Sequence, residues 1–283
     1  MYSQQPYRVD SLQLNCAVGP PSGAPLVVLH GIARRWQDFV PVLPALAQSW
    51  QVFGLDARGH GGSDRGERYR VADYVSDLGR FLEEHLRQPA ILFGHSLGAL
   101  VATGVAAQWP NLVRAIILED PPSEAYLRGF RQTTYFGLFQ VYQQLVRERP
   151  SVTEAAARLA DVQLTTAGGQ SARLGDVRDA CAIRLIARCL QDLDPAIFDA
   201  PLAGDWLAGF SQDEVLAKVS CPALLLRGDE RAGGMLPRAD ADRQMSLMKD
   251  CTRIELPSIG HQIHWMATDA TLRYVLSFLE SLD

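Results

Sequence analysis

Residues 92–98 read Leu-Phe-Gly-His-Ser-Leu-Gly, and positions 94–98 of this stretch follow the pattern G-x-S-x-G. In that pattern a strand turns sharply into a helix at the serine, and the turn leaves no room for a side chain at either glycine position. The neighbouring sequence agrees, because residues 90–93 form a short apolar run and residues 97–109 an alanine-rich helical stretch before a proline. Ser96 would lie at a helix N-terminus, where free N–H groups favour developing negative charge. The stretch therefore predicts a strand–turn–helix unit with Ser96 as a nucleophile.

An acid and a histidine follow Ser96 in the order that one arrangement of the catalytic triad requires. Asp229 follows a strand-like run at 223–226, and His261 follows the next such run. Asp120 ends an earlier strand-like run and is the alternative acid. We expect Asp229, because its strand comes immediately before the strand of the histidine. The predicted catalytic residues are therefore Ser96, Asp229 and His261.

With these motifs and two more, the chain resembles the α/β-hydrolase superfamily. Residues 29–31 (Leu-His-Gly) resemble the oxyanion loop of that family, and residues 56–63 resemble its turn after the following strand. The resemblance extends over nearly the whole chain outside about 123–210. It implies the fold of that superfamily, with an oxyanion hole formed by the backbone N–H groups of Ile32 and Leu97.

Alternating strand-like and helix-like stretches predict an α/β fold with a mostly parallel central sheet flanked by helices. A lead-in hairpin is expected at 7–9 and 12–17, followed by strands near Leu26, Val52, Ile91, Ile116, Leu225 and Ile254. Helices are expected at 42–48, 71–86, 97–109, 239–248 and 270–282. The run 115–118 shows no alternation of polar and apolar residues, which is typical of a strand covered on both faces.

The core is expected in two parts, 1–121 and 216–283, separated by a helical cap at 122–215. This insertion has no strand-like run and is too long for a structureless loop in a compact domain. Residues 211–214 form a capping-box pattern that begins a short helix returning to the core. Apolar residues at helical spacing predict two amphipathic helices, one with Tyr135, Leu138, Phe139, Tyr142 and Leu145 and one with Ala182, Leu185, Ile186, Cys189 and Leu193. The resembling family places such a cap over its active site.

The candidates for substrate contacts are Arg34, Arg35, Tyr135, Phe139 and Trp265. Arg34 and Arg35 follow the oxyanion loop, where a guanidinium group can clamp a substrate carboxylate, although solvated surface charge is the simpler interpretation. The aromatic residues of the insertion are expected to pack the cap on the core. Tyr135 or Phe139 would in addition line a substrate channel.

The composition favours an enzyme that acts on a small molecule, without a metal or other cofactor. A net charge of −5, spread without long runs, gives no reason to expect a nucleic acid or an anionic membrane as a partner. His261 and His264 form an H-x-x-H pair that lacks the glutamate of the metalloprotease motif H-E-x-x-H. Glycine-rich residues 59–62 lead into Ser-Asp-Arg, unlike a dinucleotide-binding loop.

The five cysteines form no C-x-x-C pair, and the N-terminal residues show no signal-peptide pattern, which favours a cytoplasmic protein with reduced thiols. The oligomeric state is left open.

We expect hydrolysis of a carboxylic ester-type bond in a small, largely apolar substrate through an acyl-serine intermediate. His261 would take the Ser96 proton, and the acid would orient the imidazole ring and stabilise its protonated form. Carbon–carbon bond hydrolysis, lactone opening and perhydrolysis are alternatives within the same fold. A ligand-binding receptor that retains the triad is the alternative outside enzymes.

Overall fold

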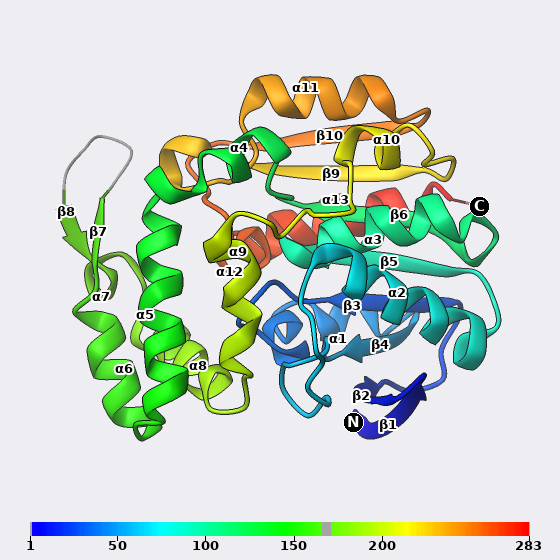
Figure 1. The fold of residues 1–283 in the computed structure, drawn as a ribbon. Helices are drawn as coiled ribbons and strands as arrows, with labels where there is room; N and C mark the ends of the chain where they lie inside the picture. The colour runs from blue at the N-terminus through cyan, green and yellow to red at the C-terminus, as the bar shows by residue number, and fades with distance from the viewer. Residues whose placement is uncertain (1, 166–170, 283) are drawn as a thin grey trace.

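A largely parallel sheet, with an antiparallel hairpin at one edge, forms the centre of the computed structural model, which describes residues 2–165 and 171–282 (Figure 1). Within those residues the sheet has eight strands in the order β1-β2-β4-β3-β5-β6-β9-β10. The strands are β1 (Ser3–Val9), β2 (Leu12–Val18), β3 (Pro25–Leu29), β4 (Gln51–Leu55), β5 (Ala90–His95), β6 (Val113–Glu119), β9 (Ala223–Gly228) and β10 (Cys251–Leu256). The pairs β1–β2 and β2–β4 are antiparallel, whereas all other pairs of this sheet are parallel. The predicted fold class is therefore confirmed.

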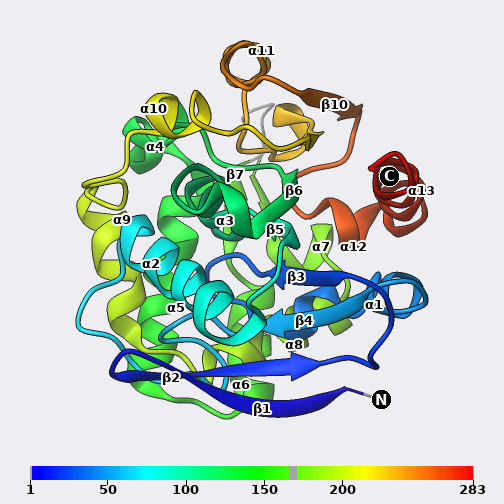
Figure 2. The same cartoon turned by 90° about the vertical axis from the view of Figure 1, so that its right-hand side faces the viewer.

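Helices cover both faces of the sheet (Figure 2). On one face, α2 (Val71–Phe81) and α3 (Leu97–Gln108) contribute buried apolar side chains to one core cluster. On the other face, α1 (Leu43–Leu46) and α13 (Thr268–Glu280) contribute to a second cluster. Strands β3 and β5 are buried along their whole length between these layers, which explains why they are apolar up to His95 at the end of β5. The helix expected at 42–48 is a single turn, and a π-helical turn at Leu82–Leu86 extends α2.

The chain between β6 and β9 is mostly helical, and its longer helices lie together beyond one end of the sheet (Figure 1). It contains α4 (Glu124–Arg128), α5 (Thr134–Glu148), α6 (Val152–Ala160), α7 (Leu174–Val177), α8 (Ala180–Leu190), α9 (Asp199–Ala203) and α10 (Gln212–Leu216). Helices α5 and α8 are the two amphipathic helices that the apolar spacing predicts. After β9 follow α11 (Arg238–Leu247) and α12 (Ile263–Met266). No helix among the described residues combines the length and apolarity needed to cross a membrane.

Two details of the insertion differ from the sequence-based expectation. It contains a short antiparallel pair, β7 (Gln163–Thr165) and β8 (Ser171–Arg173), where no strand was expected. Strands of three residues are too short to show a recognisable alternation of apolar residues. Ser211 does precede α10 as its N-cap, but its side chain accepts no capping hydrogen bond, so the expected capping box is not formed.

Candidate active site

Ser96 lies between β5 and α3, on the strand–turn–helix unit that the sequence predicts. Its backbone has φ 54° and ψ −115°, a conformation that is costly for any residue with a Cβ atom. A Cβ atom on Gly94 would lie 2.2 Å from the Gly98 carbonyl oxygen, and one on Gly98 would lie 2.0 Å from the Leu29 carbonyl oxygen. Only glycine fits at these two positions. The turn places Ser96 on the wall of a cavity of about 600 Å³.

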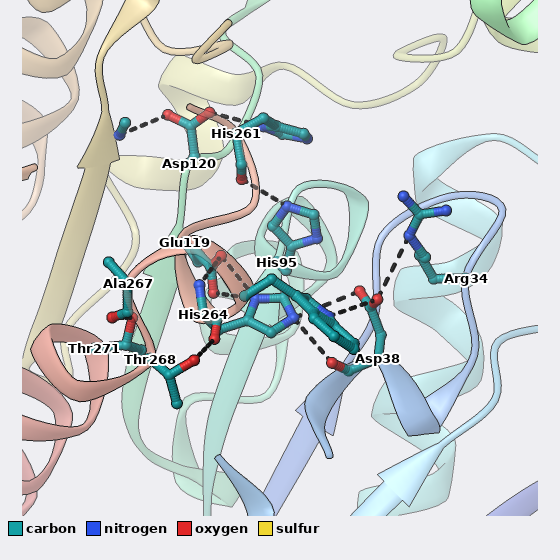
Figure 3. A network of polar contacts seen from close by, with 12 residues as sticks. Arg34, Asp38, His95, Glu119, Asp120, His261, His264, Ala267, Thr268 and Thr271 are labelled. Carbon is teal, nitrogen blue, oxygen red and sulfur yellow. Dashed lines mark hydrogen bonds and ion pairs between the residues drawn. The ribbon is translucent and has the colours of Figure 1, made fainter. Parts of the chain in front are cut away.

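His261 lies on the same cavity wall and donates a hydrogen bond to Asp120 (Figure 3). The distance from His261 Nδ1 to Asp120 Oδ2 is 2.7 Å. The carboxylate of Asp120 also accepts backbone N–H bonds from Gly228 at 3.1 Å and from Met235 at 2.7 Å. Asp120 is fully buried, and these three donors replace the water that its charge loses. Because Nδ1 carries the proton toward Asp120, Nε2 of the neutral ring is a proton acceptor.

The structure does not pair Asp229 with His261, which corrects the expected assignment of the acid. Asp229 Oδ1 accepts the N–H of Arg231 at 2.9 Å, and Oδ2 accepts that of Ser258 at 3.0 Å. These two backbone hydrogen bonds lower the pKa of Asp229. Asp229 therefore stabilises the turn after β9 and ties it to the loop before the histidine. The error has a structural cause: β6 and β9 are neighbours, so Asp120 and Asp229 follow the ends of adjacent parallel strands.

Two buried histidines hold the loop after β3 against the turn after β4. His30 accepts the N–H of Ala57 at 3.0 Å, and His60 accepts the N–H of Ala33 at 3.2 Å. Each segment is therefore bonded to a histidine of the other. Burial lowers the pKa of both rings, that of His60 to about 3, so both stay neutral and can accept these bonds.

The loop held in this way brings Ile32 to the serine. Ile32 lines the same cavity as Ser96, and a Cβ atom on the preceding Gly31 would lie 3.3 Å from the Ser96 Cβ atom. Leu97 directly follows Ser96 and begins α3, whose first N–H groups have no partner within the helix. The two residues expected to form the oxyanion hole thus belong to backbone segments that meet at the serine.

Of the candidate substrate residues, Arg34, Tyr135 and Phe139 line the cavity. Arg35 instead forms an ion pair with Asp192, with 3.4 Å between its Nη1 and the carboxylate. Trp265 donates from Nε1 to Asp38 at 3.1 Å. Neither Arg35 nor Trp265 is part of the cavity wall, because each side chain is directed to an acid elsewhere. The prediction that Arg35 and Trp265 contact the substrate is therefore corrected, because neither residue lines the cavity.

Tyr135 connects the insertion to the histidine. Its hydroxyl donates to the Gly233 carbonyl oxygen at 3.0 Å, and its ring packs edge-on against His261 with 5.6 Å between centroids. Phe139, one helical turn further along α5, packs against Phe130 and Phe198. Tyr135 is consequently a contact of His261 as well as part of the cavity wall, whereas Phe139 contributes only an apolar part of the wall.

A second histidine, His264, packs against His95 and is held by charged groups that were not predicted from the sequence (Figure 3). His264 Nδ1 lies 2.8 Å from both carboxylate oxygens of Glu119, and its Nε2 lies 3.6 Å from Asp38 Oδ2. Burial opposes protonation, but the charge of Glu119 and the hydrogen bond with Asp38 raise the pKa of His264 to about 10. Nε2 also lies 3.1 Å from the Asp38 carbonyl oxygen, so both ring nitrogens face acceptors, both must carry protons, and His264 is a buried imidazolium. The sequence does contain a signal for this network. Two adjacent acids, Glu119 and Asp120, each bond to one of two histidines three residues apart, His264 and His261.

His95, the residue before the serine, joins this network to the backbone of His261. Its Nε2 lies 2.9 Å from the His261 carbonyl oxygen, and because a carbonyl only accepts, Nε2 must be the donor. Burial lowers the pKa of His95 to about 3, so the ring is neutral. The ring also packs against His261, with 4.6 Å between centroids. Both contacts restrict the position of His261.

Comparison with known proteins identifies the class of protein to which this fold and this site belong. Residues 24–179 match the family described as "alpha/beta hydrolase fold", and the chain belongs to that family.

Two individual relatives that match nearly the whole chain share only about a quarter of their aligned residues with it. The chain is 25% identical to the 2-(acetamidomethylene)succinate hydrolase of Mesorhizobium japonicum, over 97% of this chain and 95% of that protein. It is 26% identical to the sn-1-specific diacylglycerol lipase ABHD11 of Xenopus tropicalis, over 97% of this chain and 83% of the other. The crystal structure of E-2-(acetamidomethylene)succinate hydrolase superimposes with a TM-score of 0.77 at 22% identity, covering 99% of this chain and 100% of that one. The family and these relatives make the protein a hydrolase of the α/β fold.

Proposed function

We propose that the protein is a serine hydrolase that cleaves a carboxylic ester-type bond in a small, largely apolar substrate. One observation carries the proposal: Ser96, on its strained turn, and His261, held by the buried Asp120, lie on the wall of one cavity. A serine, a neutral imidazole and a buried carboxylate in this relation are the groups that acyl transfer requires.

In the proposed reaction, Ser96 Oγ attacks the carbonyl carbon of the substrate while His261 Nε2 takes the hydroxyl proton. The backbone N–H groups of Ile32 and Leu97 bind the oxyanion that forms. His261 then returns the proton to the leaving alcohol, and a water molecule, activated by the same ring, releases the acid from the acyl-serine. We assign Asp120 as the residue that orients the ring and stabilises its protonated form.

We further propose that residues 122–215 act as a cap that selects the substrate. The cap contributes apolar cavity walls that include Phe130, Leu138, Phe139, Leu164, Leu174 and Ile186. A cavity of about 600 Å³ has the size of ordinary small-molecule sites. The residues assigned to the chemistry lie outside the cap.

The free thiols of all five cysteines support a cytoplasmic location.

The test is a panel of p-nitrophenyl esters, lactones and thioesters offered to the purified protein and to Ser96→Ala. We expect ester turnover by the wild type and its loss in the variant. Turnover that survives in Ser96→Ala would refute the serine mechanism. Binding of the panel compounds without any turnover would favour the receptor alternative, and faster lactone than ester opening would favour a lactonase.

A further inference from the structure

Arg34 brings a buried guanidinium group to the cavity with one donor unused. Its side chain lines the cavity although the residue is only 7% exposed. Nε lies 3.5 Å from Asp38 Oδ1, and Gln262, with its amide oxygen toward Arg34, accepts from Nε at 3.2 Å and from Nη2. Nη1 has no hydrogen-bond partner among the described residues. A buried donor without a partner is costly, and an acceptor supplied by a ligand would remove that cost.

Arg178, from the insertion, is a second guanidinium group on the same wall. Unlike most arginines that the structure describes, it has no carboxylate within 4.0 Å among the described residues. Both guanidinium groups act on Tyr142: burial raises the pKa of its phenol, and the charges of Arg34 and Arg178, together with a side-chain hydrogen bond from Arg34, oppose that rise. Tyr142 itself lines the cavity. The core and the insertion thus each contribute one cation to the cavity wall.

The charged groups beside Arg34 leave Arg178 available for an anion. Around Arg34 the buried ions are two cations, Arg34 and the His264 imidazolium, and two carboxylates, Asp38 and Glu119. These four charges balance one another, so neither Asp38 nor Glu119 is left over to neutralise Arg178.

We propose that the cavity binds an anionic substrate, whose carboxylate group is held between Arg34 and Arg178 while its apolar part lies against the aromatic wall. This inference rests on the proposed function and names its substrate class: an ester that carries a free carboxylate at the end remote from the bond to be cleaved. Two guanidinium groups suit a carboxylate because each can donate parallel N–H bonds to its two oxygens.

The test uses two chromogenic esters of equal acyl length, p-nitrophenyl hexanoate and the mono-p-nitrophenyl ester of adipic acid, which differ in a terminal carboxylate. The wild type should favour the adipate ester in kcat/KM. Arg34→Gln and Arg178→Gln should each lower the ratio of adipate to hexanoate kcat/KM by about tenfold or more, the effect of losing a hydrogen bond to a charged group. Arg178→Gln keeps the test decisive if the buried Arg34 variant fails to fold.

Arg35→Gln is the matched control, because Arg35 is adjacent in sequence but bonded to Asp192 outside the cavity. It removes the same charge and should leave the ratio unchanged. A ratio that is unchanged in the Arg34 and Arg178 variants, or that falls equally in Arg35→Gln, would overturn the proposal.

A binding measurement separates this inference from the proposed function. Calorimetric titration of Ser96→Ala should show tighter binding of monomethyl adipate than of dimethyl adipate, and adding Arg178→Gln should remove the difference. Equal binding of the two esters by Ser96→Ala would refute the carboxylate site whether or not the enzyme turns over esters. Absence of Ser96-dependent turnover, with the binding difference intact, would instead refute the hydrolase mechanism alone.

Discussion

Asp120 accepts a 2.7 Å hydrogen bond from the imidazole of His261, 141 residues further along the chain. The whole inserted helical segment lies between them in sequence, and it leaves the sheet after β6 and returns at β9. Because β6 and β9 are adjacent, the insertion does not separate the acid from the loop that carries the histidine. The position of the acid is therefore set by the sheet and is independent of the fold of the insertion.

The first prediction concerns the two acids. Asp120→Asn should lower kcat by on the order of 10⁴, because an amide at this place no longer holds the correct tautomer of His261 or stabilises its imidazolium. Asp229→Asn should retain kcat within about tenfold, because its carboxylate bonds only to backbone N–H groups of two loops. Steady-state kinetics of the two purified variants on one ester decides between them. The reverse ranking would return the role of the acid to Asp229.

The second prediction concerns the nucleophile. Ser96→Ala should fold normally and lose on the order of a million-fold in kcat, the usual result of removing the serine of a triad. A fluorophosphonate probe should modify the peptide that contains Ser96 in the wild type, as detected by mass spectrometry, and should leave the variant unmodified. Modification of a different serine would mean that the strained turn is not the reactive position.

Local sequence patterns predicted most of the fold. The G-x-S-x-G turn, the continuous apolar strands and the helical spacing in α5 and α8 each depend on residues close together in the chain, so they can be read directly. The short pair β7 and β8 could not, because three residues do not establish a period.

The site was harder to predict where it depends on which strands are neighbours. Asp120 and Asp229 each follow a strand and look equivalent in sequence, and only the order of the strands in the sheet distinguishes them. The partners Glu119 and Asp38 of His264 and Gln262 of Arg34 were missed for the same reason, since each lies in a separate part of the chain from its partner. The predictions for Arg35 and Trp265 failed because their side chains are directed to Asp192 and Asp38, and no sequence pattern shows the direction of a side chain.

The third prediction separates the two roles of α5. For a series of p-nitrophenyl esters, kcat/KM should rise with acyl length by about fourfold per methylene, the equivalent of about 0.8 kcal/mol, and fall once the cavity is full. Phe139→Leu shortens a side chain of the wall and so enlarges the cavity; it should move the optimum to longer acyl chains and leave acetyl ester turnover within about tenfold. An optimum that does not move would mean that Phe139 only packs the cap on the core.

Tyr135→Phe should behave differently from Phe139→Leu. It removes the hydrogen bond to Gly233 beside the ring of His261, so kcat for the acetyl ester should fall by about fivefold while the acyl-length optimum stays in place. The same kinetic series measures both effects.

The fourth prediction concerns stability at acid pH. His60 is buried and neutral with a pKa lowered to about 3, so between pH 6.5 and 3 the unfolded chain binds a proton at this position that the folded protein does not. The free energy of unfolding should therefore fall as the pH is lowered through this window. His60→Gln removes the titration and should make the fall shallower by up to about 1.4 kcal/mol per pH unit. Urea denaturation at pH 8, 6 and 5 measures the slopes, and equal slopes would mean that His60 does not remain neutral.

The last prediction concerns alkaline pH, where His264 acts in the opposite sense. Its folded pKa is raised to about 10, above the ordinary value of 6.5, so between these two values the folded protein holds a proton that the unfolded chain has released. The stabilisation is complete below pH 6.5 and should be lost progressively as the pH rises toward 10. His264→Gln should be less stable than the wild type at pH 6, because Glu119 loses its cation, and the difference should shrink as the pH approaches 10. The wild type and the His264 and His60 variants can be compared by urea denaturation from pH 6 to 10. Above about pH 7.5, where His60 is neutral in both the folded and the unfolded chain, the His60→Gln profile should run parallel to the wild type, whereas a His264→Gln profile that is also parallel there would show that His264 is not an imidazolium.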